Sequence, residues 1–340
     1  MQAIIEDASV GQRLGKKQIA TRDSAFPGQL KIDTVLVPID FSRASLQAIP
    51  WAKFLARATN GTVHLVHVHG FEYPLPVGIV PPVVTSPAEI EERLRRHLKQ
   101  LAAKSGLTKT NVYCHVRTGN AFDQICQVAR EIDADLIVTS THGHTGWKRL
   151  FLGSTAERIV RHTPCPVLVA RQPRTGRVRT PSISKIVVPL DFSRASIQGL
   201  NYAVKLARGF AATLTMLHVV SRQRFLTPGG AATPGGAAAY ADAELTKRAR
   251  AAAKERMGAL VSIPDFDGVE FKTAIQAIRG GIVEDAICAY AQKNSIDLIV
   301  TATHGRTGLR HALLGSVAEH IVRYAKGPVL VVPPRWGAKA

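Results

Sequence analysis

The stretch THGHTGWKRLFLGSTAERIV (residues 141–160) returns, with few changes, as THGRTGLRHALLGSVAEHIV (residues 303–322). Each copy follows a short apolar run and leads into a helical pattern, and the glycines keep the same spacing in both. A second pair of matching stretches lies earlier in each half, VLVPIDFSRAS (35–45) and IVVPLDFSRAS (186–196). The sequence therefore predicts a tandem duplication of one domain.

Length and composition agree with two ordinary domains. The chain has 340 residues, of which 46% are hydrophobic and 20% charged, which is typical of a globular protein with a sizeable core. No apolar run is long enough to span a membrane, and the start MQAIIEDASVGQRLGKK lacks the pattern of a signal peptide, so we expect a cytoplasmic protein. The 4 cysteines show no close pairing, which favours core positions over disulfides or a zinc site.

The charge balance bears on the partners. A formal net charge of +19 favours anionic partners through long-range electrostatics. The basic residues are spread over both halves, and no helix-turn-helix, zinc-finger or RNA-binding signature localises them. Nucleic-acid binding is therefore disfavoured, although a basic nucleic-acid-associated protein stays open as an alternative.

The order of the elements predicts the fold class. Short runs rich in Val, Ile and Leu alternate with amphipathic stretches, which is typical of an α/β fold with a parallel sheet covered by helices. In the first half the predicted strands lie near residues 34–39, 62–68, 112–116, 136–139 and 167–170. We divide the chain into an extension (1–30), a first domain (31–172), a linker (173–183), a second domain (184–334) and a tail (335–340).

Three local patterns add detail. Pro50 lies inside the first helical pattern and should kink that helix. Ser86, Pro87 and Glu89 form a capping box with proline at the first helical position, so a helix should begin there. The segment 221–239 contains Thr-Pro-Gly-Gly-Ala-Ala twice, and this composition predicts a mobile loop.

Acidic residues and glycines fall at the ends of matching strands. Ligands of a doubly wound sheet bind beyond the carboxyl ends of the strands, where the chain reverses its progress across the sheet. If the strand order is 3-2-1-4-5, the first and fourth strands flank that point. Asp40 then faces Gly143 in the first repeat, and Asp191 faces Gly305 in the second. A nucleotide fits this arrangement, with the carboxylate placed to bond a ribose or an adenine edge.

The glycine loop has the features of a phosphate-binding turn. Glycine lets the backbone approach a ligand closely, and the start of the next helix offers amide groups and a positive dipole end. In the first repeat these positions are Gly143, Gly146, Gly153 and Ser154, and in the second they are Gly305, Gly308, Gly315 and Ser316. The alternative is that the glycines only form a tight turn and the serines only cap a helix. Two copies, each matched to an aspartate, favour binding.

These motifs resemble the universal stress proteins, and tandem ones in particular, over nearly all of residues 31–333. The resemblance is carried by VPIDFS and VPLDFS on the first strand, DLIVTSTHG and DLIVTATHG on the fourth, LGSTAERIV and LGSVAEHIV on the last helix, and CPVLVA and GPVLVV on the fifth strand. It implies two Rossmann-like domains of the adenine nucleotide alpha hydrolase-like type, each with a five-stranded parallel sheet. It also implies an ATP-binding protein of the stress response.

The resemblance extends the candidate site. In the nucleotide-binding branch of the family, the motif is glycine, two residues, glycine, nine residues, and then glycine followed by serine or threonine. Its first glycine falls here on Ser140 and Ala302, which are both small, and the strand whose backbone contacts adenine places Val68 and Val219. The resemblance further implies an intramolecular pseudo-dimer of the two domains through their fifth strands. A homodimer of chains and the identity of protein partners stay open.

Binding is better supported than turnover. The sequence lacks a Walker A motif and an obvious lysine with a Mg²⁺-binding acid pair, so a slow ATPase is the second alternative, although Mg²⁺ can accompany the phosphates. His64, His67 and His69 do not supply a complete metal site. The second loop has Arg306 where the first has His144, and this charge predicts tighter ATP binding in the second repeat.

Overall fold

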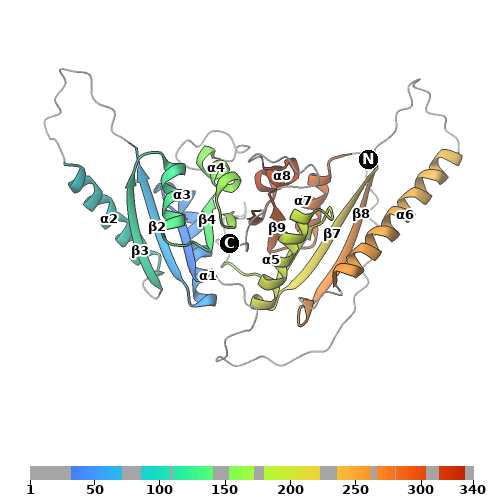
Figure 1. The fold of residues 1–340 in the computed structure, drawn as a ribbon, viewed down its shortest axis with the longest axis horizontal. Coiled ribbons are helices and arrows are strands. Elements are labelled where there is room, and N and C mark those ends of the chain that lie inside the picture. Colours follow the sequence, from blue (N-terminus) through green and yellow to red (C-terminus); the bar gives the residue numbers. More distant parts are fainter. Residues whose placement is uncertain are drawn as a thin grey trace, which may run out of the picture. The chain divides into compact units, whose positions relative to one another are not determined.

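A computed structural model describes nine segments of the chain, shown in Figure 1. They are residues 32–70, 86–107, 110–140, 153–171, 180–222, 236–261, 266–279, 281–303 and 314–333. By its contacts the chain divides into two compact units, and each is described by itself. The N-terminal unit holds residues 31–182 and the C-terminal strand, and the C-terminal unit holds most of the second repeat.

The N-terminal unit is a parallel sheet with helices on both faces. Its elements are β1 (Thr34–Pro38), a 3₁₀ turn (Ser45–Gln47), α1 (Ala48–Thr59), β2 (Thr62–His69), α2 (Pro87–Lys104), β3 (Asn111–Thr118), α3 (Ala121–Glu131), β4 (Leu136–Ser140), α4 (Ser154–His162) and β5 (Val167–Ala170). The strand order is β3-β2-β1-β4-β5, with every pair parallel, and β10 (Val329–Val332) adds an antiparallel partner to β5. The predicted order 3-2-1-4-5 is confirmed in this unit.

The C-terminal unit repeats the order of strands and helices from β1 to α4. Its elements are β6 (Lys185–Pro189), α5 (Arg194–Phe210), β7 (Thr213–Arg222), α6 (Gly236–Val261), β8 (Phe271–Arg279), α7 (Val283–Lys293), β9 (Leu298–Ala302) and α8 (Ser316–Tyr324). The strand β6 pairs parallel with both β7 and β9, and β7 pairs parallel with β8. The predicted α/β class is therefore confirmed in both repeats.

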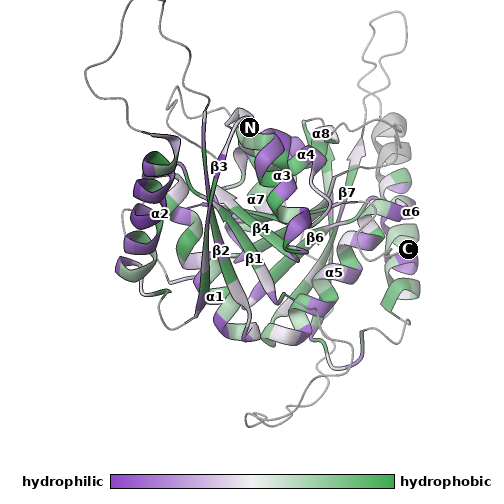
Figure 2. Cartoon of the chain, turned by 60° about the vertical axis from the view of Figure 1, so that its left-hand side comes forward, coloured by the Kyte–Doolittle hydropathy of each residue, from purple (hydrophilic) through white to green (hydrophobic). Residues whose placement is uncertain are grey.

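The central strands form the core because helices cover both of their faces. Val35, Leu36 and Val37 of β1 are fully buried, and each residue of β4 is buried as well. Strands that are buried on both faces read as continuous apolar runs, which is why they could be found in the sequence. Figure 2 shows these strands mainly in green, whereas the outer side of α2 is largely purple. The hydrophobic effect thus fixes the layers of each unit.

The start of the first helix differs from its prediction. Instead of kinking a helix, Pro50 lies in the first turn of α1, and the residues before that turn form the 3₁₀ turn. Proline has no amide hydrogen and its ring clashes with the carbonyl four residues earlier, so an α-helix cannot continue backwards past this point. The second repeat has Asn201 at the matching position, and α5 begins earlier, directly after its capping residue Ser193.

The predicted capping box and the predicted mobile loop have different outcomes. The hydroxyl of Ser86 accepts from the Glu89 amide, and the Glu89 carboxylate accepts from the Ser86 amide, so the capping box is confirmed. The mobile loop at 221–239 is wrong at both ends, because Ser221 and Arg222 pair with β8 and α6 already begins at Gly236. Its middle, 223–235, lies outside the described residues, as do the predicted extension (1–30) and tail (335–340).

Two neighbouring histidines on β2 and β3 share a proton. His64 Nδ1 and His115 Nε2 are 2.9 Å apart, and the two rings stack with a centroid distance of 5.1 Å. One ring nitrogen has to donate and the other has to accept, which two neutral rings can do and two protonated rings cannot. Burial, followed by the charge of His115, lowers the pKa of His64 from 6.5 to about 4. Burial also lowers the pKa of His115.

This pair predicts an acid-sensitive contribution to stability. Because the pKa of His64 is lower in the folded state, the unfolded chain binds the proton more readily between pH 6.5 and about 4. The free energy of unfolding should therefore fall as the pH falls through this window, by about 1–2 kcal/mol after allowance for the partial exposure of the ring. Urea titrations at pH 7 and pH 4.5 measure this fall. His64→Thr, which introduces the residue found at the matching position 215, should make it smaller; an unchanged fall would contradict the prediction.

Candidate functional site

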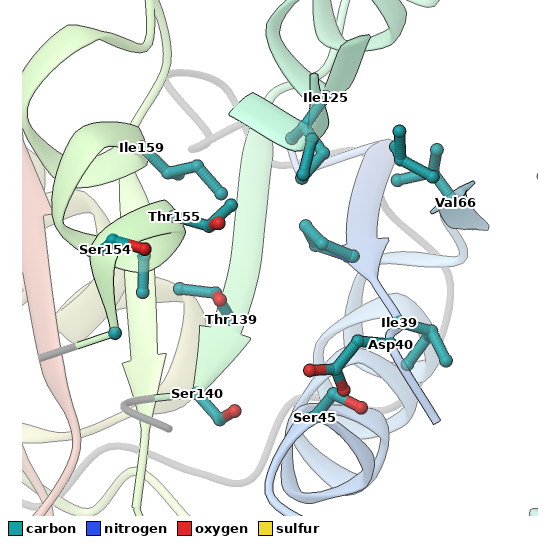
Figure 3. A pocket seen from close by; sticks show the side chains of 15 residues that line it. Ile39, Asp40, Ser45, Val66, Ile125, Thr139, Ser140, Ser154, Thr155 and Ile159 are labelled. Atoms are coloured by element: carbon teal, nitrogen blue, oxygen red, sulfur yellow. The ribbon is translucent and has the colours of Figure 1, made fainter. Parts of the chain in front are cut away.

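A pocket opens in the N-terminal unit beyond the carboxyl ends of β1 and β4. It has a volume of about 220 Å³ and receives residues from β1, β2, β4, α3 and α4 (Figure 3). The lining residues are Pro38, Ile39, Asp40, Ser45, Val66, Val68, Ala121, Ile125, Thr139, Ser140, Gly153, Ser154, Thr155, Ala156 and Ile159. The pocket thus lies where the strand order reverses, which is the usual ligand position in doubly wound sheets.

Asp40 is held in a tight turn that follows β1. Its Oδ1 accepts a hydrogen bond of 2.9 Å from the amide of Ser42, and the intervening Phe41 has a φ of +60°. A left-handed backbone is unusual for phenylalanine, and the aspartate's bond across it is one of the contacts that hold the turn. Figure 3 shows the carboxylate beside the hydroxyl of Ser45 at the edge of the pocket. The turn therefore presents an acidic group at the mouth of the site.

The start of α4 forms the opposite side of the pocket. Gly153 is its N-cap residue, with φ −56° and ψ 140°, and as a glycine it has no side chain with which to cap the helix. The first amide groups of a helix have no partner inside the helix, and its dipole favours negative charge at this end. Ser154 and Thr155 add hydroxyl groups beside these amides. This end of the helix suits an anionic group such as a phosphate.

The remaining walls divide into an apolar and a polar part. Val66 and Val68 of β2 and Ile125 of α3 line the apolar part. Thr139 and Ser140, at the end of β4, are buried and contribute hydroxyl groups. An apolar slot beside a few convergent polar groups is typical of small-molecule sites. A flat ring could occupy the slot while polar substituents reach the hydroxyls and Asp40.

All five described candidates of the first repeat line this one pocket. The structure brings together Asp40, Val68, Ser140, Gly153 and Ser154, which the sequence had placed on four different elements. The two remaining candidates of this repeat, Gly143 and Gly146, lie outside the described residues.

The candidates of the second repeat occupy matching places in the C-terminal unit. Asp191 follows β6, its Oδ1 accepts from the Ser193 amide at 2.9 Å, and Phe192 has a φ of +62°. Val219 belongs to β7, Ala302 ends β9, and Gly315 and Ser316 begin α8. The Gly315 amide donates to the Thr303 carbonyl at 2.6 Å. Gly305, Arg306 and Gly308 lie outside the described residues.

The walls of the two repeats differ in size and polarity. At positions that match in sequence, the first repeat has Val66, Ala121, Ser140 and Thr155, and the second has Leu217, Val283, Ala302 and Val317. Two of these changes add carbon atoms, and the other two remove a hydroxyl group. At these four positions the second repeat therefore has either a larger apolar side chain or one without a hydroxyl group.

Sequence reasoning missed several residues of the site. Thr155 and Ile125 reach the pocket only because α4 and α3 are rotated to face it, which a motif search does not reveal. His67 was considered only as a metal ligand, but its Nδ1 lies 2.7 Å from the carbonyl of Ile39, directly before Asp40. The sequence did contain an indication that His67 matters, because His67 and His218 occupy the same place in the second strand of both repeats.

The cysteines and histidines of the described segments are candidate ligands of a metal ion, and the cysteines are also candidate reactive thiols. Within these segments no group of three or more His, Cys, Asp or Glu side chains could hold a metal ion. Cys126 and Cys165 are buried, and burial raises the pKa of the Cys165 thiol to about 12, so this thiol stays protonated at neutral pH.

No helix in the described part of the chain has the length and apolar character needed to cross a membrane.

Comparison with known proteins agrees with the repeats and the fold. The universal stress protein family model matches residues 31–171 and 182–333. A universal stress protein of Mycolicibacterium smegmatis is 26% identical over 319 residues, covering 88% of this chain and 97% of its own. A universal stress protein of Methanocaldococcus jannaschii is 32% identical over 152 residues, covering 41% of this chain and 82% of its own.

A solved structure shares the fold over both repeats. A universal stress protein from Archaeoglobus fulgidus superposes with a TM-score of 0.60 and 19% sequence identity, covering 90% of this chain and 97% of its own. At this identity the likeness concerns the fold alone. The two family matches, taken with the duplicated motifs, show that the chain belongs to the universal stress protein family and carries two of its domains in tandem.

Proposed function

We propose that this protein binds adenine nucleotides, ATP in particular, and acts in a stress response by nucleotide-dependent sensing or signalling. The observation that carries the proposal is the pocket of the first repeat. It joins the carboxylate of Asp40 after β1, an apolar slot between β2 and α3, and the start of α4 at Gly153. These are the groups that a ribose, a base and a phosphate require.

Each part of the nucleotide has a candidate partner. The apolar walls around Val66, Val68 and Ile125 suit the adenine ring, and Asp40 is placed to accept hydrogen bonds from ribose hydroxyls. The amides at the start of α4 and the Ser154 hydroxyl suit a phosphate. A pocket of about 220 Å³ suits a base and a sugar, with the phosphates extending along α4. Mg²⁺ would be held mainly through the phosphates, because Asp40 is the single carboxylate among the described lining residues.

The two repeats should bind with unequal affinity. The charge of Arg306 favours the second site, whereas the smaller or more polar side chains at the four matching positions favour the first. A buried hydroxyl that meets a polar ligand group discriminates strongly, while the attraction between separated charges is weakened by salt. We therefore expect the first repeat to hold the nucleotide more tightly, in contrast to the order that the loop charge alone predicts.

The nucleotide content of the purified protein tests the proposal. Freshly purified protein is denatured, the released nucleotide is identified and quantified against protein, and the stripped protein is titrated with ATP, ADP and GTP by calorimetry. We expect adenine nucleotide to co-purify and ATP to bind in preference to GTP, with up to two sites per chain. Phosphate release in the same samples would measure slow hydrolysis. Protein that carries no nucleotide and binds none at millimolar ATP would contradict the proposal.

A further inference from the structure

The backbone before Asp40 is fixed by two contacts from β2. The Ile39 amide donates to the Val66 carbonyl at 2.8 Å, and the Ile39 carbonyl accepts from Nδ1 of His67 at 2.7 Å. A carbonyl oxygen can only accept a hydrogen bond, so the proton of His67 must lie on Nδ1. The hydrogen-bonding groups of Ile39 are thus bound on both sides, immediately before the turn that presents the carboxylate.

The same histidine supports the left-handed residue of the turn. The rings of Phe41 and His67 lie 4.7 Å apart with an interplanar angle of 43°, and His97 of α2 approaches Phe41 at 6.1 Å. A non-glycine residue in this conformation is strained, so it persists only where its surroundings hold it. His67 supplies both a hydrogen bond and a packing surface at this place.

The second repeat contains the same arrangement. Nδ1 of His218 lies 2.6 Å from the Leu190 carbonyl, and the Leu190 amide donates to the Leu217 carbonyl at 2.7 Å. The rings of Phe192 and His218 are 4.8 Å apart at an angle of 44°. In the second repeat Arg256 of α6 contacts the phenylalanine as His97 does in the first, with its guanidinium 4.2 Å from the Phe192 ring. Both repeats therefore keep the contact between the histidine and the turn, although the third residue of the cluster is His97 in one and Arg256 in the other.

We propose that His67 and His218 are positioning residues for the ligand. Each fixes the turn that carries the site's aspartate, Asp40 or Asp191, by holding the carbonyl before it and the phenylalanine after it. The inference rests on the proposed function for its ligand, but the effect on the turn itself does not depend on any ligand. His67 does not line the pocket of the first repeat, so it acts through the turn, and the matching contacts of His218 give it the same role in the second repeat.

Substitutions at His67 separate hydrogen bonding from packing. An asparagine amide nitrogen can take the place of Nδ1, a glutamine amide extends toward the place of Nε2, and leucine fills the space without a donor. We therefore expect His67→Leu and His67→Gln to weaken ATP binding in the first repeat about tenfold, and His67→Asn to stay within about threefold of the parent. Affinities are measured by calorimetry on the full chain carrying Gly315→Asp, which isolates the first site. His218→Leu in the Gly153→Asp chain is the matched test of the second site.

Amide exchange provides a readout that needs no nucleotide. The Ser42 amide donates to Asp40, so its hydrogen exchange reports on the turn directly. We expect faster exchange at Ser42 in His67→Leu and near-parental exchange in His67→Asn. Unchanged exchange, or an asparagine variant no better than leucine and glutamine, would overturn the inference. If no nucleotide binds but Ser42 exchanges faster, the positioning role stands and the proposed ligand is wrong. Because asparagine and glutamine differ only in reach, this pair keeps the test valid if the leucine variant does not fold.

Discussion

Gly153→Asp should abolish nucleotide binding in the first repeat while the protein remains folded. Gly153 has φ −56° and ψ 140°, which any residue can adopt, and aspartate is among the preferred N-cap residues. The new carboxylate would accept from the first amides of α4 and would occupy the place proposed for a phosphate. Repulsion between like charges at about 4 Å costs about 1–4 kcal/mol near a protein surface, and the lost amide donors add to it. We expect ATP affinity at this site to fall at least about 100-fold.

Asparagine separates charge from size in this experiment. Gly153→Asn caps the helix with a side chain of the same shape, so it should keep the fold and reduce ATP affinity far less. Gly315→Asp makes the same change in the second repeat and should remove the weaker component of a two-site titration. Equal losses for aspartate and asparagine would show that bulk, and not charge, closes the site. If Gly153→Asp binds ATP as well as the parent does, the phosphates do not bind at the start of α4.

Asp135→Ala should lower the free energy of unfolding by about 3 kcal/mol. Oδ2 of Asp135 accepts from the amides of Asp33 and Thr34 at 2.9 and 3.0 Å, and the Asp135 amide donates to the Thr34 carbonyl at 3.0 Å. This side chain thereby joins the start of β4 to the start of β1. Alanine would leave two partly buried amide groups without their charged acceptor, which costs more than a neutral hydrogen bond. Urea titration followed by circular dichroism measures the change.

An exposed aspartate of the same unit serves as the control. Asp123 lies on α3, 3.9 Å from Arg158, with a side chain that is 62% exposed, and exposed pairs of this kind contribute less than about 1 kcal/mol. Asp123→Ala should therefore change stability far less than Asp135→Ala. Asp297, whose Oδ2 accepts from the Ser184 and Lys185 amides, offers the same test in the second repeat. Equal effects of Asp135→Ala and Asp123→Ala would contradict this account.

The sequence predicted the sheet well because burial on both faces leaves a clear trace. The runs that became β1, β4 and β5 were placed to within a residue or two, since central parallel strands are uninterrupted in apolar character. Composition was misleading at 221–239, where glycine, proline and alanine suggested a loop. There the ladder between β7 and β8 continues through Ser221, and the alanines after Gly236 join a helix. Pairing with a distant strand is not visible in local sequence.

The candidate site also contains residues that the sequence predicted and residues that it did not. Asp40 and Gly153 were found because they stand at the end of a strand and the start of a helix, where topology alone brings residues together. Ser140 was found only through the resemblance to the family's glycine motif. Thr155 was missed because its place depends on the rotation of α4. His67 was missed because its partner is a main-chain carbonyl on the neighbouring strand. Every residue has a main-chain carbonyl, so the sequence does not show which residue accepts such a hydrogen bond.

The left-handed Phe41 and Phe192 bear on how the two halves have diverged. Glycine or asparagine would adopt this backbone at lower cost, and after a duplication one copy is free to drift toward such a replacement. Neither copy has done so, although their surroundings have changed, with His97 beside one ring and Arg256 beside the other. In each half the phenylalanine ring packs against a histidine of the second strand, so this contact offsets the cost of the backbone in both repeats.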